Sequence, residues 1–511
     1  MRRPLLSAAL FAVSAILLPQ VVASAQQPTN DPETIRIDAG AAAAPFPHFW
    51  EQMFGPGRAI LSLRESYRND LRAVKSATGL KYVRFHAILQ DELGVYNEDE
   101  HGNPVYNFNY VDQVYDGLLA NGVRPVVEIS FMPKKLAFNP DDLHPFWYKQ
   151  NVSPPKSFER WDDLMKRLAQ HLVDRYGIDE VAQWYFEVWN EPNIDFWGGV
   201  PRQESYFNLY AHTARDLKSV SPRLRVGGPA TAATAWIPDF LAFAAKEHVP
   251  VDFVSTHAYA NEPVKRVLGR DETIPTEDRM GAYVSAVRAQ IDASPLPHLP
   301  LLWTEWNVTP AKNARQTPYV GPALANVIRE CDGKVDYMSY WTFSEVFEEN
   351  GPEPAPFRYF GIRALGGIDK PSFYDFALLH KLGTERIANP SRNAIVTRLS
   401  DGSLAIALWN LVDPNDPPRS RRFALRITGL PQNAPVDIER VDETHGNVMP
   451  FYAKMGSPVS PTASQVDELN RESNPGPPQK TALTAGTLDL ELGSNALYLL
   501  HVDAAPPAKR K

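Results

Sequence analysis

The feature that most constrains this chain is a regular alternation of short apolar runs with longer amphipathic segments between residues 46 and 384. In the segment 157–177, for example, Trp161, Leu164 and Leu168 fall on one helical face. Eight runs have the composition of strands: HFWEQMF (48–54), YVRFHA (82–87), RPVVEIS (124–130), QWYFEVWN (183–190), RVGGPA (225–230), DFVSTHAY (252–259), LLWTEWN (301–307) and YMSYWTF (337–343). Strands alternating with helices in this way predict an α/β fold, a (β/α)8 TIM barrel. An open doubly wound sheet is the main alternative, but no Gly-rich phosphate loop follows the first run.

A second pattern begins at about residue 385. Apolar and polar residues then alternate with a period of two, as at Ile395, Thr397 and Leu399, between turns rich in Asp, Gly and Pro. This period predicts a C-terminal antiparallel β-sandwich, an accessory domain over 385–503 that follows the barrel over 46–384. Its simplest role is to brace the barrel, and glycan binding is the alternative.

Three smaller segments complete the predicted organisation. We expect residues 26–45, which contain ETIRIDAG, to add an edge strand to the sandwich. The Pro-rich and Ser-rich stretch 457–480 predicts a long loop, and 504–511 a loose tail.

The N-terminus has the three parts of a secretory signal. Arg2 and Arg3 precede an apolar run over 5–18, and Ala23-Ser24-Ala25 follows. This layout predicts a signal peptide over 1–25 and an exported protein, periplasmic or extracellular. The alternative, a permanent anchor, is disfavoured because the run is too short to span a bilayer.

Charge and cysteine content exclude several classes of partner. The formal net charge is −8 before the two arginines of the signal are removed, so nucleic acid and anionic membranes are not expected as partners. Cys331 is the only cysteine, which rules out an intrachain disulfide and predicts a buried structural thiol. The spacing of His and Cys fits no zinc-type site, and we expect neither metal nor cofactor. The sequence makes no prediction of oligomeric state.

Two glutamates end predicted strands in similar surroundings. Glu191 ends the fourth run in WNEPN, and Glu305 lies at the end of the seventh in WTEWN. The carboxyl ends of barrel strands share one mouth, so we expect the two side chains to face each other. Opposed carboxylates between aromatic walls suit cleavage of a glycosidic bond, which needs one protonated and one ionised acid. Arg84, in the second run, is the cation expected to keep Glu305 ionised. Taken singly, either glutamate is more often a surface carboxylate.

The set of motifs resembles a known family. FEVWNEPN followed by WTEWN is similar to clan A glycoside hydrolases, and more narrowly to glycoside hydrolase family 39, which includes β-xylosidases and α-L-iduronidases. The resemblance covers the barrel and extends into the strand-rich C-terminal region. Supporting stretches are YVRFHAILQDELGVY (82–96), STHAY (255–259), SYWTFSEVFEE (339–349) and YFGIRALGGIDKPSFYDFALLHKLG (359–383).

The resemblance implies catalytic roles for two residues and a substrate-binding role for the residue before one of them. Glu191 would be the general acid/base and Glu305 the nucleophile of a retaining double displacement. Asn190 would bind the sugar 2-hydroxyl.

Five further residues would complete the sugar site by the same resemblance. His257 and Tyr259 would line the pocket, with the Tyr259 hydroxyl near the nucleophile. Trp341 would be the apolar platform under the sugar ring, and His86 and Glu345 would bind ring hydroxyls. The alternatives are a satisfied strand-end histidine for His86, packing for Tyr259, barrel core for Trp341, and a solvated acidic loop for Glu345.

The predicted activity is removal of terminal β-D-xylose. A uronic acid substrate needs a cation, and Lys265 and Arg266 follow His257 only at a distance, which disfavours an iduronidase. Ala87 stands where a glycine would fit the family pattern, which bears on the size of the sugar pocket. The alternatives are an endo-acting or other exo-glycosidase of the family, such as an exopolysaccharide hydrolase, and a non-catalytic glycan-binding protein.

Overall fold

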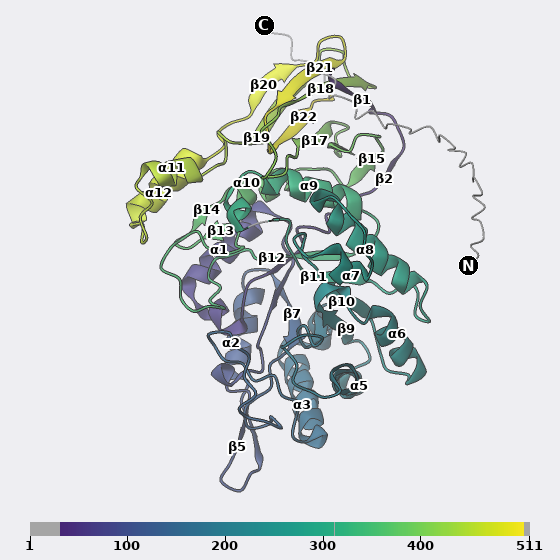
Figure 1. The fold of residues 1–511 in the computed structure, drawn as a ribbon, viewed down its shortest axis with the longest axis vertical. Helices are drawn as coiled ribbons and strands as arrows, with labels where there is room; N and C mark the ends of the chain where they lie inside the picture. The colour runs from purple at the N-terminus through teal and green to yellow at the C-terminus, as the bar shows by residue number, and fades with distance from the viewer. Residues whose placement is uncertain (1–30, 311, 505–511) are drawn as a thin grey trace, which may run out of the picture.

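The structure is a computed structural model that describes residues 31–310 and 312–504. A barrel forms the body of the molecule, and a β-sandwich lies against one side of it, at the top of Figure 1. The predicted signal peptide and most of the predicted tail lie outside the described residues. Among those described, no helix combines the length and apolar character that crossing a bilayer requires.

Eight strands form a closed barrel, which confirms the predicted fold class. Each predicted run overlaps one strand, although β3 and β9 end one residue beyond theirs, and all neighbouring strands of the barrel pair in parallel. The runs are apolar nearly throughout because strands of a parallel barrel are buried on both faces. In chain order the strands are β3 (Met53–Gly55), β4 (Tyr82–Phe85), β7 (Arg124–Ile129), β8 (Tyr185–Val188), β9 (Arg225–Thr231), β10 (Phe253–His257), β11 (Leu301–Trp306) and β12 (Tyr337–Trp341).

Helices surround the barrel. They begin and end where the sequence directs: the Ser157 hydroxyl caps α3, and Gly177, at φ 79°, ends it. The helices are α1 (Glu65–Ala77), α2 (Asn109–Leu119), α3 (Phe158–Tyr176), α4 (Ile178–Val181), α5 (Arg202–Val220), α6 (Ile237–Lys246), α7 (Val264–Leu268), α8 (Thr276–Asp292), α9 (Val320–Cys331) and α10 (Pro371–His380).

Short elements decorate the loops between barrel strands. A hairpin projects at the end of the molecule away from the sandwich (Figure 1), and a second lies beside α10. They comprise β5 (Tyr96–Glu98) with β6 (Pro104–Tyr106), β13 (Arg363–Ala364) with β14 (Ile368–Asp369), and the 3₁₀ turns η1 (Ala59–Leu63), η2 (Asp91–Leu93), η3 (Ala232–Thr234) and η4 (Lys312–Gln316).

The sandwich consists of a seven-stranded and a three-stranded sheet, with orders β2-β15-β16-β17-β22-β19-β20 and β1-β18-β21. Its pairs are antiparallel except that β1 runs parallel to β18. After β1 the chain continues into the barrel and does not turn back to β18. No hairpin joins these two strands, so they are free to run parallel. The strands are β1 (Glu33–Asp38), β2 (Ala43–Pro45), β15 (Glu385–Ile387), β16 (Ala394–Arg398), β17 (Leu404–Asn410), β18 (Arg421–Thr428), β19 (Pro435–Val441), β20 (Gln479–Ala482), β21 (Thr487–Leu492) and β22 (Ala496–Val502).

The predicted long loop over 457–480 is wrong, because it contains the helix α12 (Ala463–Ser473). Thr462 and Gln465 form a capping box at its start, and the buried Leu469 anchors its apolar side. The prolines that suggested a loop lie outside the helix. It packs against α11 (Met449–Lys454), and the pair projects beside the barrel (Figure 1).

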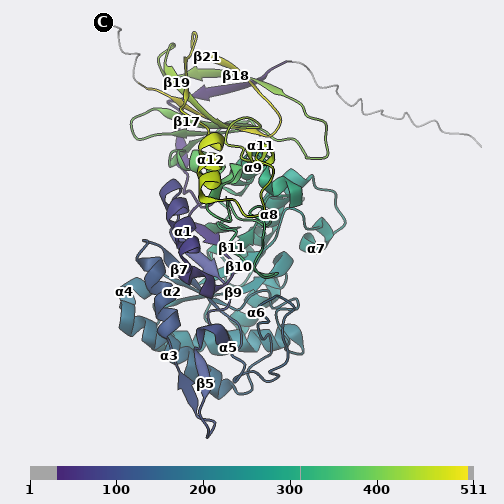
Figure 2. The same cartoon turned by 90° about the vertical axis from the view of Figure 1, so that its left-hand side faces the viewer.

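The apolar core of the barrel continues onto one face of the sandwich, whose interior forms a second cluster. The cluster that includes the barrel helices also contains Ile395, Trp409 and Leu497 of the sandwich. An ion pair between Arg386 and Asp332 (2.6 Å) adds to the junction. Figure 2, turned by 90°, shows the sandwich seated on the barrel from the side.

Candidate active site

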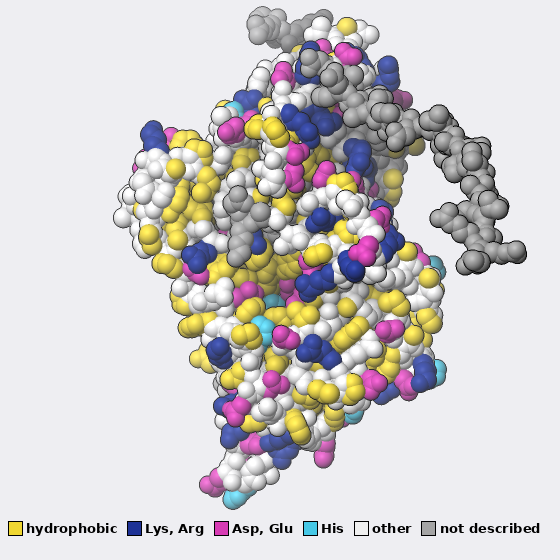
Figure 3. Space-filling view, in the orientation of Figure 1, with side chains coloured by type: hydrophobic (Ala, Val, Ile, Leu, Met, Phe, Trp, Pro, Cys, Tyr) yellow, Lys and Arg dark blue, Asp and Glu magenta, His cyan; other side chains and the backbone are white. Residues whose placement is uncertain are grey.

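Glu191 and Glu305 meet at the carboxyl end of the barrel. Glu305 lies within β11, and Glu191 follows β8 by three residues. Glu191 has a positive φ of 43°, and its N–H donates to the carbonyl of Ala230 (2.9 Å). A non-glycine residue rarely adopts this conformation, and such residues gather at functional sites. In the space-filling view, acidic and histidine side chains lie together in a hollow over the barrel (Figure 3).

The two carboxyl groups lie close together. One oxygen of Glu191, one ring nitrogen of His257 and one oxygen of Glu305 all lie within 4.8 Å of one another. Glycosidases that form a covalent intermediate hold their two carboxyl groups about 5–5.5 Å apart, whereas inverting enzymes need about 6.5–9.5 Å to admit a water molecule. The close approach of these two oxygens fits direct attack by one carboxylate and is short of the spacing that admits a water molecule.

Glu305 has a donor on each oxygen. Arg84 Nη1 donates to Oε1 (2.8 Å), and the Tyr259 hydroxyl donates to Oε2 (2.6 Å). Both contacts favour the ionised carboxylate, since one partner is charged and both hydrogen-bond to it. The structure thus brings Arg84 and Tyr259 to Glu305, as the sequence predicted.

Arg84 is fully buried and surrounded by acids. Burial alone would lower the pKa of its guanidinium, but Glu187 and Glu128, with Glu305, more than offset this and raise it. Arg84 Nε donates to Glu187 (2.5 Å), and Nη2 lies 2.8 Å from Glu128. The arginine therefore stays charged beneath the pocket.

Glu191 has the opposite surroundings. Burial raises the pKa of its carboxyl to about 7, although the nearby His86 and Arg84 act to lower it. Its Oε1 lies 3.0 Å from Nδ1 of the fully buried His257. A carboxyl with this pKa carries a proton in neutral solution often enough to donate it.

Asn190 and His86 complete the polar floor. Asn190 Oδ1 accepts from Arg84 (2.9 Å), while its amide nitrogen has no hydrogen bond among the described residues. His86 Nδ1 lies 2.6 Å from Glu128, and Nε2 lies 3.6 Å from Glu305. The His86 edge thus faces Glu305, and Asn190 shares with Glu305 the donor Arg84.

Trp341 forms an apolar wall beside these groups. Its ring centroid lies 4.9 Å from that of His86. A Cβ atom at position 55 would come within 2.1 Å of the Trp341 ring, so Gly55 is what lets the ring lie against β3. Ala87 has a φ of 70°, the left-handed conformation that favours glycine, which explains why a glycine would fit there.

The structure disagrees with the predicted sugar contact of Glu345. Lys370 Nζ donates to its Oε1 (2.5 Å) and the Tyr359 N–H to its Oε2 (2.6 Å), and both side chains of the ion pair are buried. Each carboxylate oxygen is therefore occupied. The sequence alone does not separate this glutamate from the two others that follow it in SEVFEE.

Glu349 is the member of that run that faces the site. Burial, together with the nearby Glu305 and Glu191 and against the effect of His86, raises the pKa of its carboxyl to about 8. Its carbonyl accepts from the N–H of Trp147 (2.8 Å), which ties together the loops after β12 and β7. Its neighbour Glu348 instead pairs with Arg58 and Arg64.

A layer of buried polar residues below the pocket was missed from the sequence. It includes Glu128, Glu187 and Thr304, all fully buried within barrel strands. The signal was present, since Glu128 and Glu187 are charged residues inside otherwise apolar runs. Such residues are buried only when they are paired.

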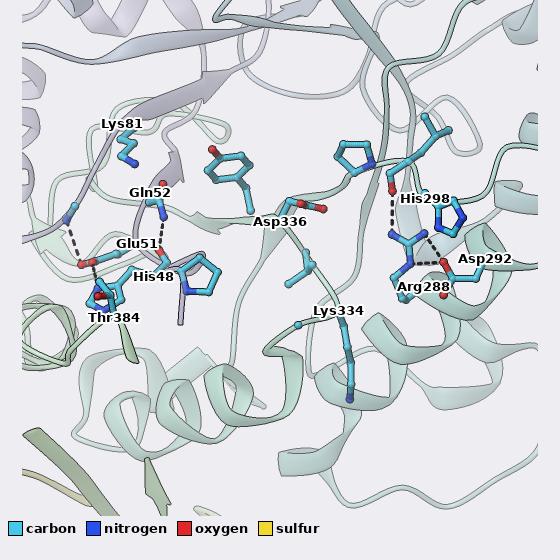
Figure 4. Close-up of a pocket in the computed structure, with 17 residues that line it drawn as sticks. His48, Glu51, Gln52, Lys81, Arg288, Asp292, His298, Lys334, Asp336 and Thr384 are labelled. Atoms are coloured by element: carbon cyan, nitrogen blue, oxygen red, sulfur yellow. Dashed lines mark hydrogen bonds and ion pairs between the residues drawn. The ribbon is translucent and has the colours of Figure 1, made fainter. Parts of the chain in front are cut away.

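A cavity of about 1030 Å³ lies at the other end of the barrel (Figure 4). Its lining residues Lys81 and Asp336 precede β4 and β12, so it opens where strands begin rather than where they end. There Glu51 is bracketed by His48 (2.6 Å) and His380 (2.9 Å), three groups that satisfy one another's hydrogen bonds. This cavity is separate from the two glutamates of the mouth.

Comparisons with known proteins agree with the family resemblance seen in the sequence. The sequence profile of glycosyl hydrolases family 39 matches residues 33–487. A β-xylosidase of Geobacillus stearothermophilus is 39% identical over 470 residues, which cover 89% of this chain and 92% of that protein. A β-xylosidase of Caldicellulosiruptor saccharolyticus is 35% identical over 452 residues, covering 86% and 91%. A solved structure of a monomeric β-xylosidase from Caulobacter crescentus CB15 has a TM-score of 0.84 and 34% identity, covering 93% of this chain and 100% of that chain.

Proposed function

Because the chain belongs to glycosyl hydrolases family 39, we propose that it removes terminal β-D-xylose from xylo-oligosaccharides or β-xylosides with retention of configuration. Family membership makes the protein a glycoside hydrolase with a carbohydrate substrate. One observation supports the mechanism most directly: two carboxyl groups within 4.8 Å of each other, Glu191 and Glu305, occupy opposite electrostatic environments.

The first step uses both glutamates. Glu305 attacks the anomeric carbon as a carboxylate and forms an ester bond, while Glu191 gives its proton to the departing glycosidic oxygen. Arg84 and Tyr259 hold the attacking carboxylate in place through their hydrogen bonds. Asn190 donates its free amide hydrogen to the sugar 2-hydroxyl, a contact that strengthens as positive charge develops on the ring.

The second step reverses these roles. A water molecule attacks the anomeric carbon, the ester bond to Glu305 breaks, and Glu191 takes up the proton of the water. The sugar is released with its original anomeric configuration.

A neutral sugar suits the charges of the site. Glu349 lies near both Glu191 and Glu305, so a third acid faces the pocket. Arg266, which follows His257 in the chain, is half exposed and lies 3.5 Å from Glu262, an acid that partners it. The carboxylate of a uronic acid would lie among these acids, and within the described residues no unpaired cation stands beside His257 to receive it. Trp341 offers the apolar face that a sugar ring stacks on.

The sequence supports an exported enzyme. The charged, apolar and small-residue segments before Ala25 favour removal of a signal and action in the periplasm or outside the cell. The acidic net charge favours neither nucleic acid nor an anionic membrane as a partner.

A panel of substrates tests the sugar and the mode of cleavage. The purified protein is assayed with the 4-nitrophenyl β-D-xyloside and β-D-glucoside and with an aryl α-L-iduronide. Release of 4-nitrophenol from the xyloside well above the other two is expected. With xylotetraose, early products should be xylose and xylotriose. Fast cleavage of the iduronide, or xylobiose as the main early product, would contradict the proposal.

A further inference from the structure

A chain of buried hydrogen bonds runs from the barrel interior to Glu191. The Thr304 hydroxyl donates to Glu187 Oε1 (2.7 Å). His257 Nε2 lies 3.0 Å from the Thr304 hydroxyl oxygen, and His257 Nδ1 lies 3.0 Å from Glu191 Oε1. Glu187, Thr304 and His257 are all fully buried, so water cannot substitute for any of these partners.

These hydrogen bonds are compatible with only one placement of the hydrogen atoms. Glu187 accepts the Nε hydrogen of Arg84 on its other oxygen (2.5 Å), so both of its oxygens act as acceptors. The single hydroxyl hydrogen of Thr304 is used on Glu187, and the Thr304 oxygen must therefore accept from His257 Nε2–H. Neutral His257 then carries its lone pair on Nδ1, which faces Glu191. That contact is a hydrogen bond only when Glu191 supplies the proton.

We propose that Thr304 and Glu187 are positioning residues that fix the Nε2–H tautomer of His257 and thereby keep the catalytic proton on Glu191. This inference rests on the proposed function, in which Glu191 is the acid. None of the three residues needs to touch the sugar. They act by making the ionised form of Glu191 unfavourable before the substrate is cleaved.

The charges around the chain agree with this placement. Burial lowers the pKa of His257 to about 4, with Glu305 opposing this and Arg84 contributing to it, so the ring is neutral at working pH. Glu305 Oε1 lies 3.7 Å from His257 Nδ1, too far to take its place in the hydrogen bond. The other charged or titratable groups near His257 or Glu191 are Glu128, His86, Arg266, Tyr259, Glu262 and Glu349.

The arrangement serves both steps of the reaction. In the first, Glu191 holds a proton that its surroundings do not remove. After the proton leaves with the aglycone, ionised Glu191 faces the lone pair of His257, an unfavourable pairing. This favours uptake of the proton from the attacking water in the second step.

The test is a substitution that removes only the hydroxyl, Thr304→Val. Without its acceptor, His257 can move its hydrogen to Nδ1 and donate to ionised Glu191, which lowers the pKa of that carboxyl. We expect the alkaline limb of the kcat/KM profile to move down by about one pH unit. At pH 7, turnover of methyl β-D-xyloside, with its poor leaving group, should fall about fivefold more than that of the 2,4-dinitrophenyl xyloside.

Two controls separate this from loss of structure. Thr304→Ser keeps the hydroxyl and should restore the wild-type alkaline limb. Thr213→Val removes another fully buried hydroxyl, on α5, where it accepts from Trp161 (2.9 Å), and should leave the profile unchanged. If Thr304→Val does not fold, as judged by circular dichroism, Thr304→Ala removes the same hydroxyl without added bulk.

The outcomes are distinguishable. An alkaline limb unmoved in a folded variant that lacks the hydroxyl, or equal losses on both leaving groups, overturns the positioning role while the wild type stays active. A wild type inactive on every aryl β-xyloside refutes the proposed function, and the inference that rests on it falls too.

Discussion

Glu191 and Glu305 are the same type of side chain in one pocket, yet their neighbours differ. Two hydrogen-bond donors, one of them charged, contact Glu305, whereas burial raises the pKa of Glu191 to about 7. Glu345 and Glu349 also differ in their partners. Lys370 forms an ion pair with Glu345, whereas Glu349 lies near the two glutamates of the site. At this scale, residue type predicts chemistry only when its partners are known.

The pH dependence of kcat/KM should report Glu191. An acid must carry its proton to donate it, and with a pKa of about 7 that form is lost as the pH rises above this value. Activity on a substrate with a poor leaving group should therefore fall about tenfold per pH unit on the alkaline side. In Glu191→Gln this limb should disappear, and the rate on that substrate should fall by about 10²–10⁴-fold.

The same variant should lose far less of the first-step rate on a 2,4-dinitrophenyl xyloside, because that leaving group departs without a proton. Stopped-flow release of dinitrophenol measures this step. Equal losses on both substrates, or an alkaline limb that persists in Glu191→Gln, would assign the acid to another residue.

The site residues could be predicted from the sequence in part. The motifs WNEPN and WTEWN marked Glu191 and Glu305 because both lie at ends of apolar runs. The choice among the acids of SEVFEE could not be made, since it depends on Lys370, which is 25 residues away in sequence. The polar chain through Thr304 likewise requires side chains from β8, β10 and β11 to be adjacent in space.

Among the elements, the barrel strands could be predicted from the sequence, whereas the helix α12, which lies between two strands of the sandwich, could not. Strands buried on both faces have apolar runs that stand out from any loop. The helix α12 has eleven residues between prolines, with only Leu469 and Ser473 buried, so its apolar period is weak. Its capping box, Thr462 with Gln465, was the available signal.

Helix α10 carries a buried acid that should weaken the protein. Both oxygens of Asp375 lack a hydrogen-bond partner among the described residues, and burial raises the pKa of its carboxyl well above the usual value. A raised folded-state pKa means that folding takes up a proton. The resulting penalty is absent below the pKa of the unfolded state, near 3.8, and grows as the pH rises.

The substitution Asp375→Asn should therefore stabilise the fold at pH 7 by about 2 kcal/mol, with a gain that shrinks toward pH 4. Urea unfolding at several pH values measures this, with Asp141→Asn as a control at an exposed loop position. A variant that is less stable at pH 7, or a gain independent of pH, would show that Asp375 has a structural role as an acid.

Across the whole molecule, the barrel and the sandwich are expected to unfold together. The sandwich has an apolar interior of its own, but residues such as Trp409 and Leu497 on one face of its larger sheet belong to the same buried cluster as the barrel helices. The N-terminal segment strengthens the link, since β1 and β2 belong to the two sheets of the sandwich and lead directly into β3. The division visible in the sequence is thus a change of pattern within one packed body.

Calorimetry tests this cooperativity. The full chain should show one heat-absorption peak, because exposing the shared core would destabilise either part on its own. A fragment of residues 46–384 should lack the near-ultraviolet circular dichroism of a packed interior. Two well-separated peaks, or a fragment as ordered as the barrel in the full chain, would mean that the parts are independent.

The most direct test of the central claim, that Glu305 is the nucleophile of a retaining β-xylosidase, is covalent trapping. A 2-deoxy-2-fluoro-β-D-xylosyl fluoride has a good leaving group but slows both steps, so the ester with the nucleophile should accumulate. We expect activity to be lost as one fluoroxylosyl group is attached per chain. Mass spectrometry of peptides should locate this group on Glu305. A label on another residue, or rapid turnover to the inverted sugar without any label, would contradict it.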